Sequence, residues 1–305
     1  MRFFSHSVFG VMAMATVLGF ASTAARANLI YVSMSDSTIV TYDVSLATAS
    51  AIQASRTTFA SGSPLNAPEE MVFDSAGNLF TTNRNGNTVS KIASNGSITT
   101  FASGTGSLLN KPIGLAIDAS DNLYVANENG SSITKLTKAG VASTFASSIS
   151  TYGLAADAAG NIYAASGGSS IVKFTPAGAS STFSSTNLST PRGMTFDASG
   201  NLFVSNFGNH TIAKFTSDGT GSTFLTTIGL PGPNDVAFDA VGNLYVACNG
   251  NRTIQKYNSA GEFQFSWSTG GPRTQHLLMQ PGAVPAPGAI ALLGMAGLVG
   301  RRRRS

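Results

Sequence analysis

Cysteine is almost absent from this sequence, which contains a single one, Cys248. One cysteine excludes a disulfide within the chain, and it also excludes a zinc site built from cysteines. Cys248 ends the apolar run LYVAC. We therefore expect a small buried side chain there rather than a reactive thiol.

Charge is scarce as well, because charged residues make up 10% of the 305 residues, against about 25% in an ordinary soluble domain. The net charge of +4 comes from the two ends. The six terminal basic residues are Arg2, Arg26, Arg301, Arg302, Arg303 and Arg304. The chain between them holds the other 12 basic residues and all 14 acidic ones, a net charge of −2. It carries no basic stripe, which argues against nucleic acid as a partner.

One sequence motif repeats five times along the middle of the chain. Each copy contains Asp-x-x-Gly-Asn or a close variant, and the aspartates are 44, 39, 40 and 42 residues apart. These aspartates are Asp74, Asp118, Asp157, Asp197 and Asp239. Residue type and position recur together, so the chain is a repeat protein and its repeat unit decides the fold.

Each repeat is predicted to contain four short antiparallel strands. In the copy around Asp197, the first strand starts at Pro191, the second is Leu202-Phe203-Val204, and the third is 211–215. The fourth ends in Ser-Thr-Phe. The Asp side chain of the intervening turn bonds nearby backbone, and its glycine adopts a positive φ. Four strands in roughly 40 residues is typical of a propeller blade.

The strand count predicts how the ring closes. The second, third and fourth strands each occur six times, whereas the first occurs five times, because the predicted mature chain starts at Asn28. A missing strand would leave an exposed sheet edge. We therefore predict that Pro272–Met279 supplies the missing innermost strand and pairs with the N-terminal blade. The fold class is all-β, a six-bladed β-propeller of four-stranded antiparallel blades over residues 28–279.

These repeats resemble the NHL family of six-bladed propellers over residues 28 to 268. The core Asp-x-x-Gly-Asn-Leu-Tyr-Val and the third-strand pattern Ile-x-Lys-Phe carry the resemblance. Asn209-His210 keeps two of the letters that name the family.

Residues 1–27 have the pattern of a secretory signal peptide. Arg2 is followed by an apolar stretch from Val8 to Ala21 and by small residues at Ala25 and Ala27. We expect the Sec machinery to export the chain and signal peptidase to cleave it after Ala27.

Residues 280–305 are predicted to be a sorting and anchor tail. The 13 residues from Gly288 to Gly300 are uncharged, short for a membrane span of about 20 residues. The arginines behind them favour the cytoplasmic side. The tail resembles the PEP-CTERM sorting signal of Gram-negative bacteria, with Ala in place of the usual Glu. The residues that carry this resemblance are Val284, Pro285, Ala286 and Pro287, then Arg301, Arg302, Arg303 and Arg304.

The PEP-CTERM resemblance implies a location and a processing partner. It implies a C-terminal hydrophobic helix that holds the exported chain transiently in the inner membrane. An exosortase-like enzyme would then process the tail. The resemblance also implies an exopolysaccharide setting, so the chain is expected at the cell surface or in the extracellular medium.

The start of the innermost strands holds the candidate site. One position of the repeat carries Glu70, Gly114, Gly153, Gly193 and Asp235. The glycines let backbone approach the axis. Glu70 and Asp235, with Asn234, are candidate ligands for Ca²⁺ or another divalent cation; the alternative is a set of solvated carboxylates at the channel mouth. Pro233-Asn234-Asp235 resembles a motif of gluconolactonase-like propellers, which use a Glu, an Asn and an Asp in a similar location.

Other polar residues are interpreted as structural. The repeated aspartates are expected to shape their own turns, His210 to lie on the surface, and His276 to be a lone structural histidine of the closing strand. Recurring asparagines at the ends of second strands are expected to cap loops, with sugar binding as the alternative; they are Asn83, Asn127 and Asn206. Lysines recurring on the third strand are expected to be solvated; they are Lys91, Lys135, Lys173, Lys214 and Lys256.

These observations predict an exported propeller that binds an extracellular protein or polysaccharide, catalyses no reaction and needs no cofactor. The first alternative is a metal-dependent hydrolase or lactonase at the channel mouth, with Glu70, Asn234 and Asp235 as metal ligands. The second alternative is a spacer that binds nothing specifically.

Overall fold

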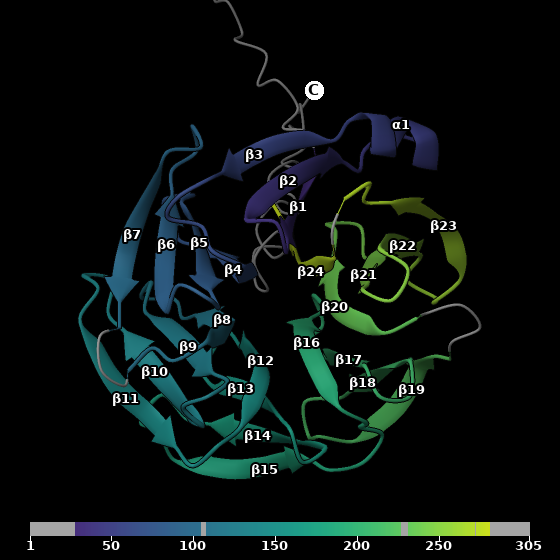
Figure 1. Cartoon of the computed structure of the whole chain (residues 1–305). Coiled ribbons are helices and arrows are strands. Elements are labelled where there is room, and N and C mark those ends of the chain that lie inside the picture. Colours follow the sequence, from purple (N-terminus) through teal and green to yellow (C-terminus); the bar gives the residue numbers. More distant parts are fainter. Residues whose placement is uncertain (1–27, 105–107, 227–230, 272, 281–305) are drawn as a thin grey trace, which may run out of the picture.

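The fold is an all-β, six-bladed propeller, as the repeat predicts. The computed structural model describes residues 28–104, 108–226, 231–271 and 273–280. Six four-stranded antiparallel sheets are arranged around a central axis (Figure 1). The predicted signal peptide, and the predicted tail from residue 281 onward, lie outside the described residues. Within the described part of the chain, no helix has the length and apolar character needed to cross a membrane.

Each blade runs outward from the axis in four strands. The innermost strands are β24 (Thr274–Met279), β4 (Pro68–Phe73), β8 (Pro112–Ile117), β12 (Thr151–Ala156), β16 (Pro191–Phe196) and β20 (Pro233–Phe238). The second strands are β1 (Leu29–Met34), β5 (Leu79–Asn83), β9 (Leu123–Asn127), β13 (Ile162–Ser166), β17 (Leu202–Asn206) and β21 (Leu244–Cys248).

The outer half of each blade is built in the same way. The third strands are β2 (Thr38–Asp43), β6 (Thr88–Ile92), β10 (Ser132–Leu136), β14 (Ser170–Phe174), β18 (Thr211–Phe215) and β22 (Thr253–Tyr257). The outermost strands are β3 (Thr57–Ser61), β7 (Ile98–Ser103), β11 (Ala142–Ser147), β15 (Ser180–Ser184), β19 (Gly221–Leu225) and β23 (Phe263–Ser268). A short helix, α1 (Ala49–Ala54), precedes β3, and the Thr48 hydroxyl caps it by accepting from Ala51 N–H.

The ring closes with a strand from the far end of the chain, which confirms the prediction. β24 pairs antiparallel with β1, and the first blade has the order β24-β1-β2-β3. Val32 lies opposite Leu277, and Tyr31 lies opposite Leu278. The strand begins at Thr274 rather than at Pro272. Pairing with β24 covers the inner edge of β1, which would otherwise present unpaired backbone groups.

The repeated aspartates shape the turns between the first and second strands, as expected. Asp74 Oδ1 accepts the N–H groups of Ala76 and Asn78 at 3.0 and 2.7 Å, and Oδ2 accepts the Asn78 side-chain amide at 2.7 Å. Asp157, Asp197 and Asp239 make the same three kinds of bond, at similar distances. Asp118 also accepts from its turn, where Asp121 replaces glycine with a φ of 61°.

The hydrophobic core is divided among the interfaces between neighbouring blades. Tyr31 of the first blade packs edge-on against Phe73 of the second, with ring centroids 5.2 Å apart. Equivalent clusters join the other neighbouring blades, including the sixth and the first, where Leu277 contributes. Cys248 is fully buried in one of them, as expected. Because each blade buries its faces only on its two neighbours, the core is complete only when the ring is closed.

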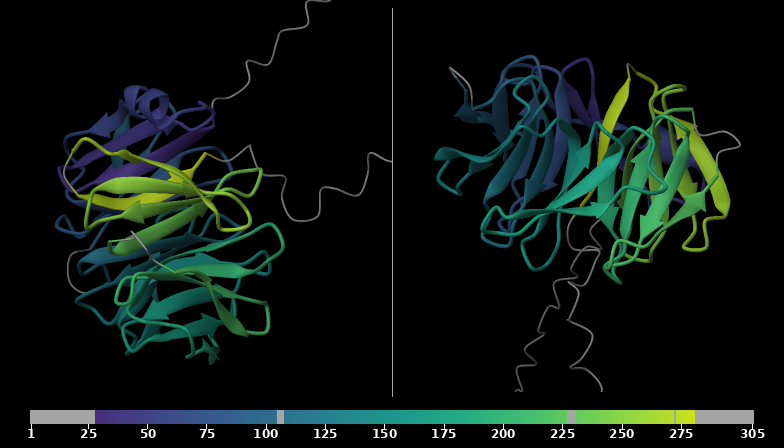
Figure 2. Two further views of the ribbon diagram at one scale, coloured as in Figure 1. Left: turned by 90° about the vertical axis from the view of Figure 1, so that its right-hand side faces the viewer. Right: turned by 90° about the horizontal axis from the view of Figure 1, so that it is seen from below.

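The innermost strands all run in one direction along the axis, so the central channel has two different mouths. The strands start at one mouth, where Pro68, Pro112 and Pro191 lie, and they end at the other. Both ends of the described chain lie at the second mouth, because Gln280 N–H donates to Leu29 O at 2.9 Å. The disc is seen from the side in Figure 2.

Candidate functional site

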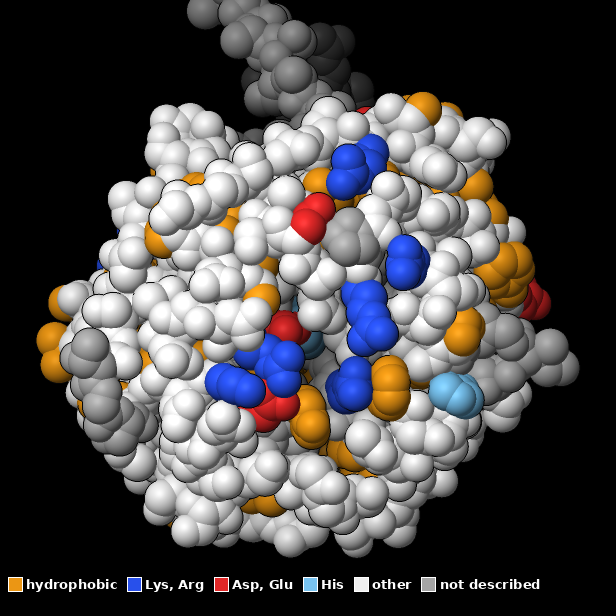
Figure 3. All heavy atoms as spheres, in the orientation of Figure 1, with side chains coloured by type: hydrophobic (Ala, Val, Ile, Leu, Met, Phe, Trp, Pro, Cys, Tyr) orange, Lys and Arg blue, Asp and Glu red, His pale blue; other side chains and the backbone are white. Residues whose placement is uncertain are grey.

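The mouth at which the innermost strands start is polar, and all six blades contribute to it. It encloses a hollow of about 260 Å³. Figure 3 shows this face, with basic and acidic side chains gathered around the hollow near its centre. The polar mouth is lined by Glu69, Arg84, Ile113, Glu128, Tyr152, Gly153, Arg192, Asn234, Asn249, Arg273, Gln275 and His276.

Two positions of the repeat supply most of this lining. The first is the residue after the opening Pro or Thr of an innermost strand, which places Glu69, Tyr152 and Arg192 on the rim. The second is the residue after the second strand, which places Arg84 and Glu128 beside them. A six-fold ring brings equivalent positions of different repeats together around one axis.

Arg84 and Glu128 form a forked ion pair across two blades. Arg84 Nε and Nη2 donate to the two carboxylate oxygens of Glu128, each at 2.8 Å. The bidentate geometry fixes both side chains. Hydrogen bonding and the charge of Glu128 raise the pKa of Arg84 even though burial opposes this. The pair therefore neutralises its own charges and leaves the rest of the mouth to set the potential.

Arg192 is held in place mainly by an aromatic ring and an amide. Its guanidinium carbon lies 3.4 Å from the ring centroid of Phe207 and 5.5 Å from that of Tyr152. Nη1 donates to Asn234 Oδ1 at 2.6 Å. Nε is buried and has no hydrogen-bond partner in the described part of the chain. Burial lowers the pKa of Arg192 against the opposing pull of Glu69 and Glu128.

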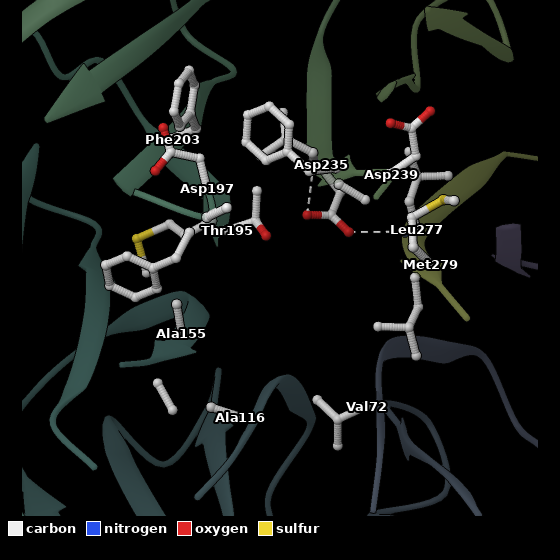
Figure 4. Close-up of a pocket in the computed structure, with 18 of the residues that line it drawn as sticks. Val72, Ala116, Ala155, Thr195, Asp197, Phe203, Asp235, Asp239, Leu277 and Met279 are labelled. Carbon is white, nitrogen blue, oxygen red and sulfur yellow. Dashed lines mark hydrogen bonds between the residues drawn. The ribbon is translucent and has the colours of Figure 1, made fainter. Parts of the chain in front are cut away.

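The opposite mouth is wider and mainly apolar. It encloses a cavity of about 660 Å³. Figure 4 looks into this cavity and shows Val72, Ala116, Ala155 and Thr195 around it, with a dashed line joining Asp235 to Leu277. Asp197 and Asp239 also contribute to its lining. We call it the apolar mouth.

Three buried titratable residues connect the two mouths: Glu70, Asp235 and His276. Glu70 and Asp235 line the apolar mouth, whereas His276 lines the polar one. One ligand atom of each lies within 4.8 Å of the others. His276 Nδ1 is 3.4 Å from Asp235 Oδ2, and Nε2 is 3.6 Å from Glu69 Oε2. These are ion-pair distances, and Nδ1 has no hydrogen-bond partner among the described residues.

Backbone N–H groups hold both carboxyls of this cluster. Glu70 Oε2 accepts from Leu115 at 3.1 Å. Asp235 accepts from Val236 through Oδ1 and from Leu277 through Oδ2, each at 2.8 Å. Asp235 therefore fixes the closing strand to the sixth blade. The strands β16 and β20 also approach each other closely here. This requires glycine at position 193, because a Cβ on Gly193 would lie 2.6 Å from Asp235 Cα.

Burial and mutual charge shift the proton affinities of the cluster. Burial raises the pKa of Glu70 to about 8, with the Asp235 charge adding to the effect and His276 opposing it. Burial alone would lower the pKa of His276, but the nearby charge of Asp235, with the charges of Glu70 and Glu69, raises it to about 9. Burial also raises the pKa of Glu69. At neutral pH the cluster therefore holds a cationic imidazole and a protonated Glu70.

The structure brings together only part of the predicted metal set. Glu70 and Asp235 meet at His276 and are buried, with 7% and 3% exposure, so the expectation of solvated carboxylates is wrong for them. The amide of Asn234 serves the polar mouth, where it donates to Gln275 O and accepts from Arg192. His276 takes the third place in the cluster. We expected His276 to be a lone structural histidine and did not predict its contacts with Asp235 and Glu69.

Most of the other polar residues singled out in the sequence make structural contacts. Asn83 is fully buried, and its amide donates to the Thr88 and Ser90 hydroxyls. His210 is exposed, as expected. The lysines of the third strands lie 5.1–5.5 Å from the aromatic ring opposite them on the second strand, a recurring cation–π contact. This contact agrees with the expected snorkelling, since the Lys91 side chain lies over a ring and is still 38% exposed.

Arg84, Glu128, Tyr152 and Arg192 were not predicted as site residues. The repeat alignment contained the necessary signal, because these side chains occupy two equivalent positions of the repeat. Those positions vary from copy to copy while the turn between the first and second strands recurs. A position that faces the axis and varies between repeats is the one free to serve a ligand.

Comparison with known proteins supports the fold. Residues 188–215, which include β16 to β18, match the family model of the NHL repeat. The match covers three of the four strands of one blade, within the region that resembles this family. No curated protein matches the chain.

Solved structures with the same fold include both binding proteins and enzymes. A chain of a nidogen/laminin complex superposes with a TM-score of 0.72 at 17% identity, covering 83% of this chain and 98% of that one. A streptogramin B lyase has a TM-score of 0.63 at 16% identity, covering 79% of each chain. Virginiamycin B lyase from Staphylococcus aureus has a TM-score of 0.60 at 15% identity, covering 76% and 78%. At these identities the likeness shows the fold alone.

Proposed function

We propose that this protein is an exported propeller of the cell envelope that binds an extracellular polysaccharide or protein at its polar mouth and catalyses no reaction. The observation that carries the proposal is that all six blades contribute residues to this one enclosed polar hollow. A hollow lined by convergent polar groups is the usual form of a specific binding site. Within the described lining of the polar mouth there is no serine, threonine or cysteine to act as a nucleophile.

The position of the chain ends supports an orientation in which the polar mouth faces the medium. Both described ends lie at the apolar mouth, where Met279 and Gln280 line the cavity. The predicted tail, with its motif from Val284 to Pro287 and its four terminal arginines, continues from there. A chain tethered by that tail presents its polar mouth to the medium. An innermost strand of six residues, at about 3.3 Å per residue, separates the two mouths.

Thiol labelling on intact cells tests the location. Cys248 is buried, so a new exposed cysteine is the reactive one. Arg273→Cys is at the polar mouth, and Val241→Cys, 80% exposed, is in a turn on the opposite side of the disc. A membrane-impermeant maleimide should label Arg273→Cys on intact cells. Labelling only after lysis would show that this mouth is not exposed at the cell surface.

The same two variants test the binding site. The full chain, immobilised in mild detergent, should retain polysaccharide or protein extracted from the cell's own extracellular matrix. A bulky maleimide on Arg273→Cys should abolish this retention by blocking the hollow, and the same label on Val241→Cys should leave it unchanged. Equal retention by both labelled variants would refute the polar mouth as the site.

A second candidate function is metal-dependent hydrolysis at the apolar mouth. The observation in its favour is the cluster of Glu70, Asp235 and His276 at the end of a large cavity. These three residues, rather than the predicted set with Asn234, would hold a metal. Two carboxylates and an imidazole suit Zn²⁺ better than Ca²⁺, which takes six to eight oxygen ligands. Such an ion would activate a water molecule for attack on a lactone or ester.

A proton and a metal ion compete for this cluster. A metal needs His276 neutral, and the carboxylates that raise the pKa of His276 to about 9 attract either cation. The imidazolium already supplies the positive charge that Asp235 requires. A thermal melt decides between them, because a ligand of the folded state raises the melting temperature. If Zn²⁺ raises the melting temperature of the parent chain but not that of the Glu70→Gln variant, the result would support the hydrolase.

A further inference from the structure

The polar mouth carries an excess of positive charge. Three arginines and two glutamates line it: Arg84, Arg192, Arg273, Glu69 and Glu128. Arg84 is paired with Glu128, and Glu69 lies 3.6 Å from His276. No carboxylate lies within 4.0 Å of Arg192 or Arg273 in the described part of the chain. The two arginines without carboxylates therefore favour an anionic ligand.

Arg192 is built as a receptor for such a group. Phe207 and Tyr152 cover parts of its guanidinium, and Asn234 holds Nη1. The remaining donors include a buried Nε that has no partner in the described chain. An unsatisfied buried donor destabilises the free protein, so a ligand that accepts a hydrogen bond from it is favoured. A planar guanidinium fixed in this way matches a carboxylate through two parallel hydrogen bonds.

The size and the remaining lining of the hollow point to one sugar ring. Its volume of about 260 Å³ is below the range of about 300–1,000 Å³ typical of drug-sized ligands. Asn249 and Gln275 contact each other at 3.4 Å, and Gln275 contacts Glu69 at 3.5 Å. Bonds this long leave the amides available to hydroxyl groups. Tyr152 adds an apolar ring face with a polar tip.

We propose that the polar mouth binds the carboxylate-bearing sugar units of an acidic polysaccharide, with Arg192 as the partner of the uronate carboxylate. This inference rests on the proposed binding function and names the class of its ligand. Arg273, exposed at the rim, adds a second positive charge. Tyr152 packs against the sugar ring, and the amides of Asn249 and Gln275 bind its hydroxyls.

Calorimetric titration of the full chain in mild detergent tests the proposal. The probes are a galacturonic acid trimer, the same trimer with its carboxyls methyl-esterified, and a glutamate peptide of equal charge. We expect the acid trimer to bind at least about tenfold more tightly than the ester, because charged hydrogen bonds are lost in the ester. Its affinity should also fall between low and high salt.

Three variants locate the interaction. Arg192→Met should weaken binding of the acid trimer at least about tenfold, and the exposed Arg273→Gln should weaken it less. Arg252→Gln is the matched control, because Arg252 is an exposed arginine on the same side of the disc that does not line the hollow. Its affinity should equal that of the unmodified chain. A circular-dichroism melt checks that each variant is folded, and Arg273→Gln keeps the test valid if Arg192→Met is not.

Each contrary result has a distinct meaning. Equal binding of acid and ester, or unchanged binding by folded Arg192→Met, overturns the carboxylate inference. Equal or tighter binding of the glutamate peptide overturns the sugar. If no uronate binds but the labelled Arg273→Cys chain has lost retention of the cell's own matrix, this inference fails while the proposed function stands. If labelling leaves retention unchanged, the proposed function itself fails.

Discussion

Asp235 joins the sixth blade to the closing strand, because its Oδ2 accepts the N–H of Leu277 at 2.8 Å. The same oxygen lies 3.4 Å from His276 Nδ1. One buried carboxylate on β20 therefore contacts β24 in two ways, by a hydrogen bond from the backbone of Leu277 and by its charge beside His276. Removing this carboxylate should affect the whole ring, since each blade is stabilised by its two neighbours.

Asp235→Ala should lower the free energy of unfolding by about 3–5 kcal/mol, because it leaves a buried imidazolium without its partner. Asp235→Asn should cost less, since its oxygen still accepts one backbone N–H. Urea denaturation of both variants measures the difference. Asp36→Ala, at an exposed aspartate of the first blade, is the control and should unfold like the parent chain. Similar values for all three variants would contradict the assignment.

Stability should fall as the pH rises from about 6 to 9. The folded-state pKa values of His276, about 9, and Glu70, about 8, are above the ordinary values of 6.5 and 4.5 for these side chains. Both groups bind protons more tightly in the folded state, so their contribution is complete below the unfolded pKa values and is lost through the folded ones. The groups facing His276 are Asp235, Glu69 and Glu70.

Urea midpoints between pH 4.5 and 9.5 measure this dependence. Glu70→Gln should flatten the profile from about pH 5 to 8, and His276→Gln should flatten it from about pH 7 to 9. Glu70→Gln should also be more stable than the parent at pH 8, since a neutral amide avoids burial of a charge. A parent profile that is level from pH 6 to 9 would show that the cluster keeps the same protonation on unfolding.

A chain that ends at Gly271 should lose the closed ring. It lacks β24, so β1 becomes an exposed edge and Leu277 leaves its cluster. We expect a lower melting temperature together with self-association through the free edge. Size-exclusion chromatography with light scattering measures the association. A chain that ends at Gln280 keeps β24 and is the control; if both chains melt together as monomers, β24 contributes nothing.

Gly193→Ala should destabilise the fold by about 1–3 kcal/mol through overpacking. Its Cβ would meet the backbone of Asp235, which cannot move without disturbing β24. Gly168→Ala is a matched control, since nothing lies within 4 Å of its Cβ and its φ is ordinary. That control should change stability by less than about 0.5 kcal/mol. Equal melting temperatures for the two variants would mean that the inner strands can separate at no cost.

The sequence by itself determined the fold and the ring closure. The Asp-x-x-Gly-Asn turn and the strand patterns act over a few residues, so each copy of the repeat specifies its own local structure independently of the rest of the chain. Counting the strands showed that one innermost strand was missing and where its replacement lay. The signal peptide and the sorting tail, which lie outside the described residues, stay predictions from the sequence.

Only the tertiary structure decided the site. Residues 69 and 84 belong to one repeat and residues 128, 152 and 192 to three others, and the ring brings their side chains to one mouth. Adjacent residues were also separated, since Asp235 joins the buried cluster while Asn234 serves the polar mouth. Successive side chains of a strand point in opposite directions, and the direction that each one takes depends on the packing of the neighbouring blade. Charge and burial in the cluster, and hence the proton on His276, follow from that packing.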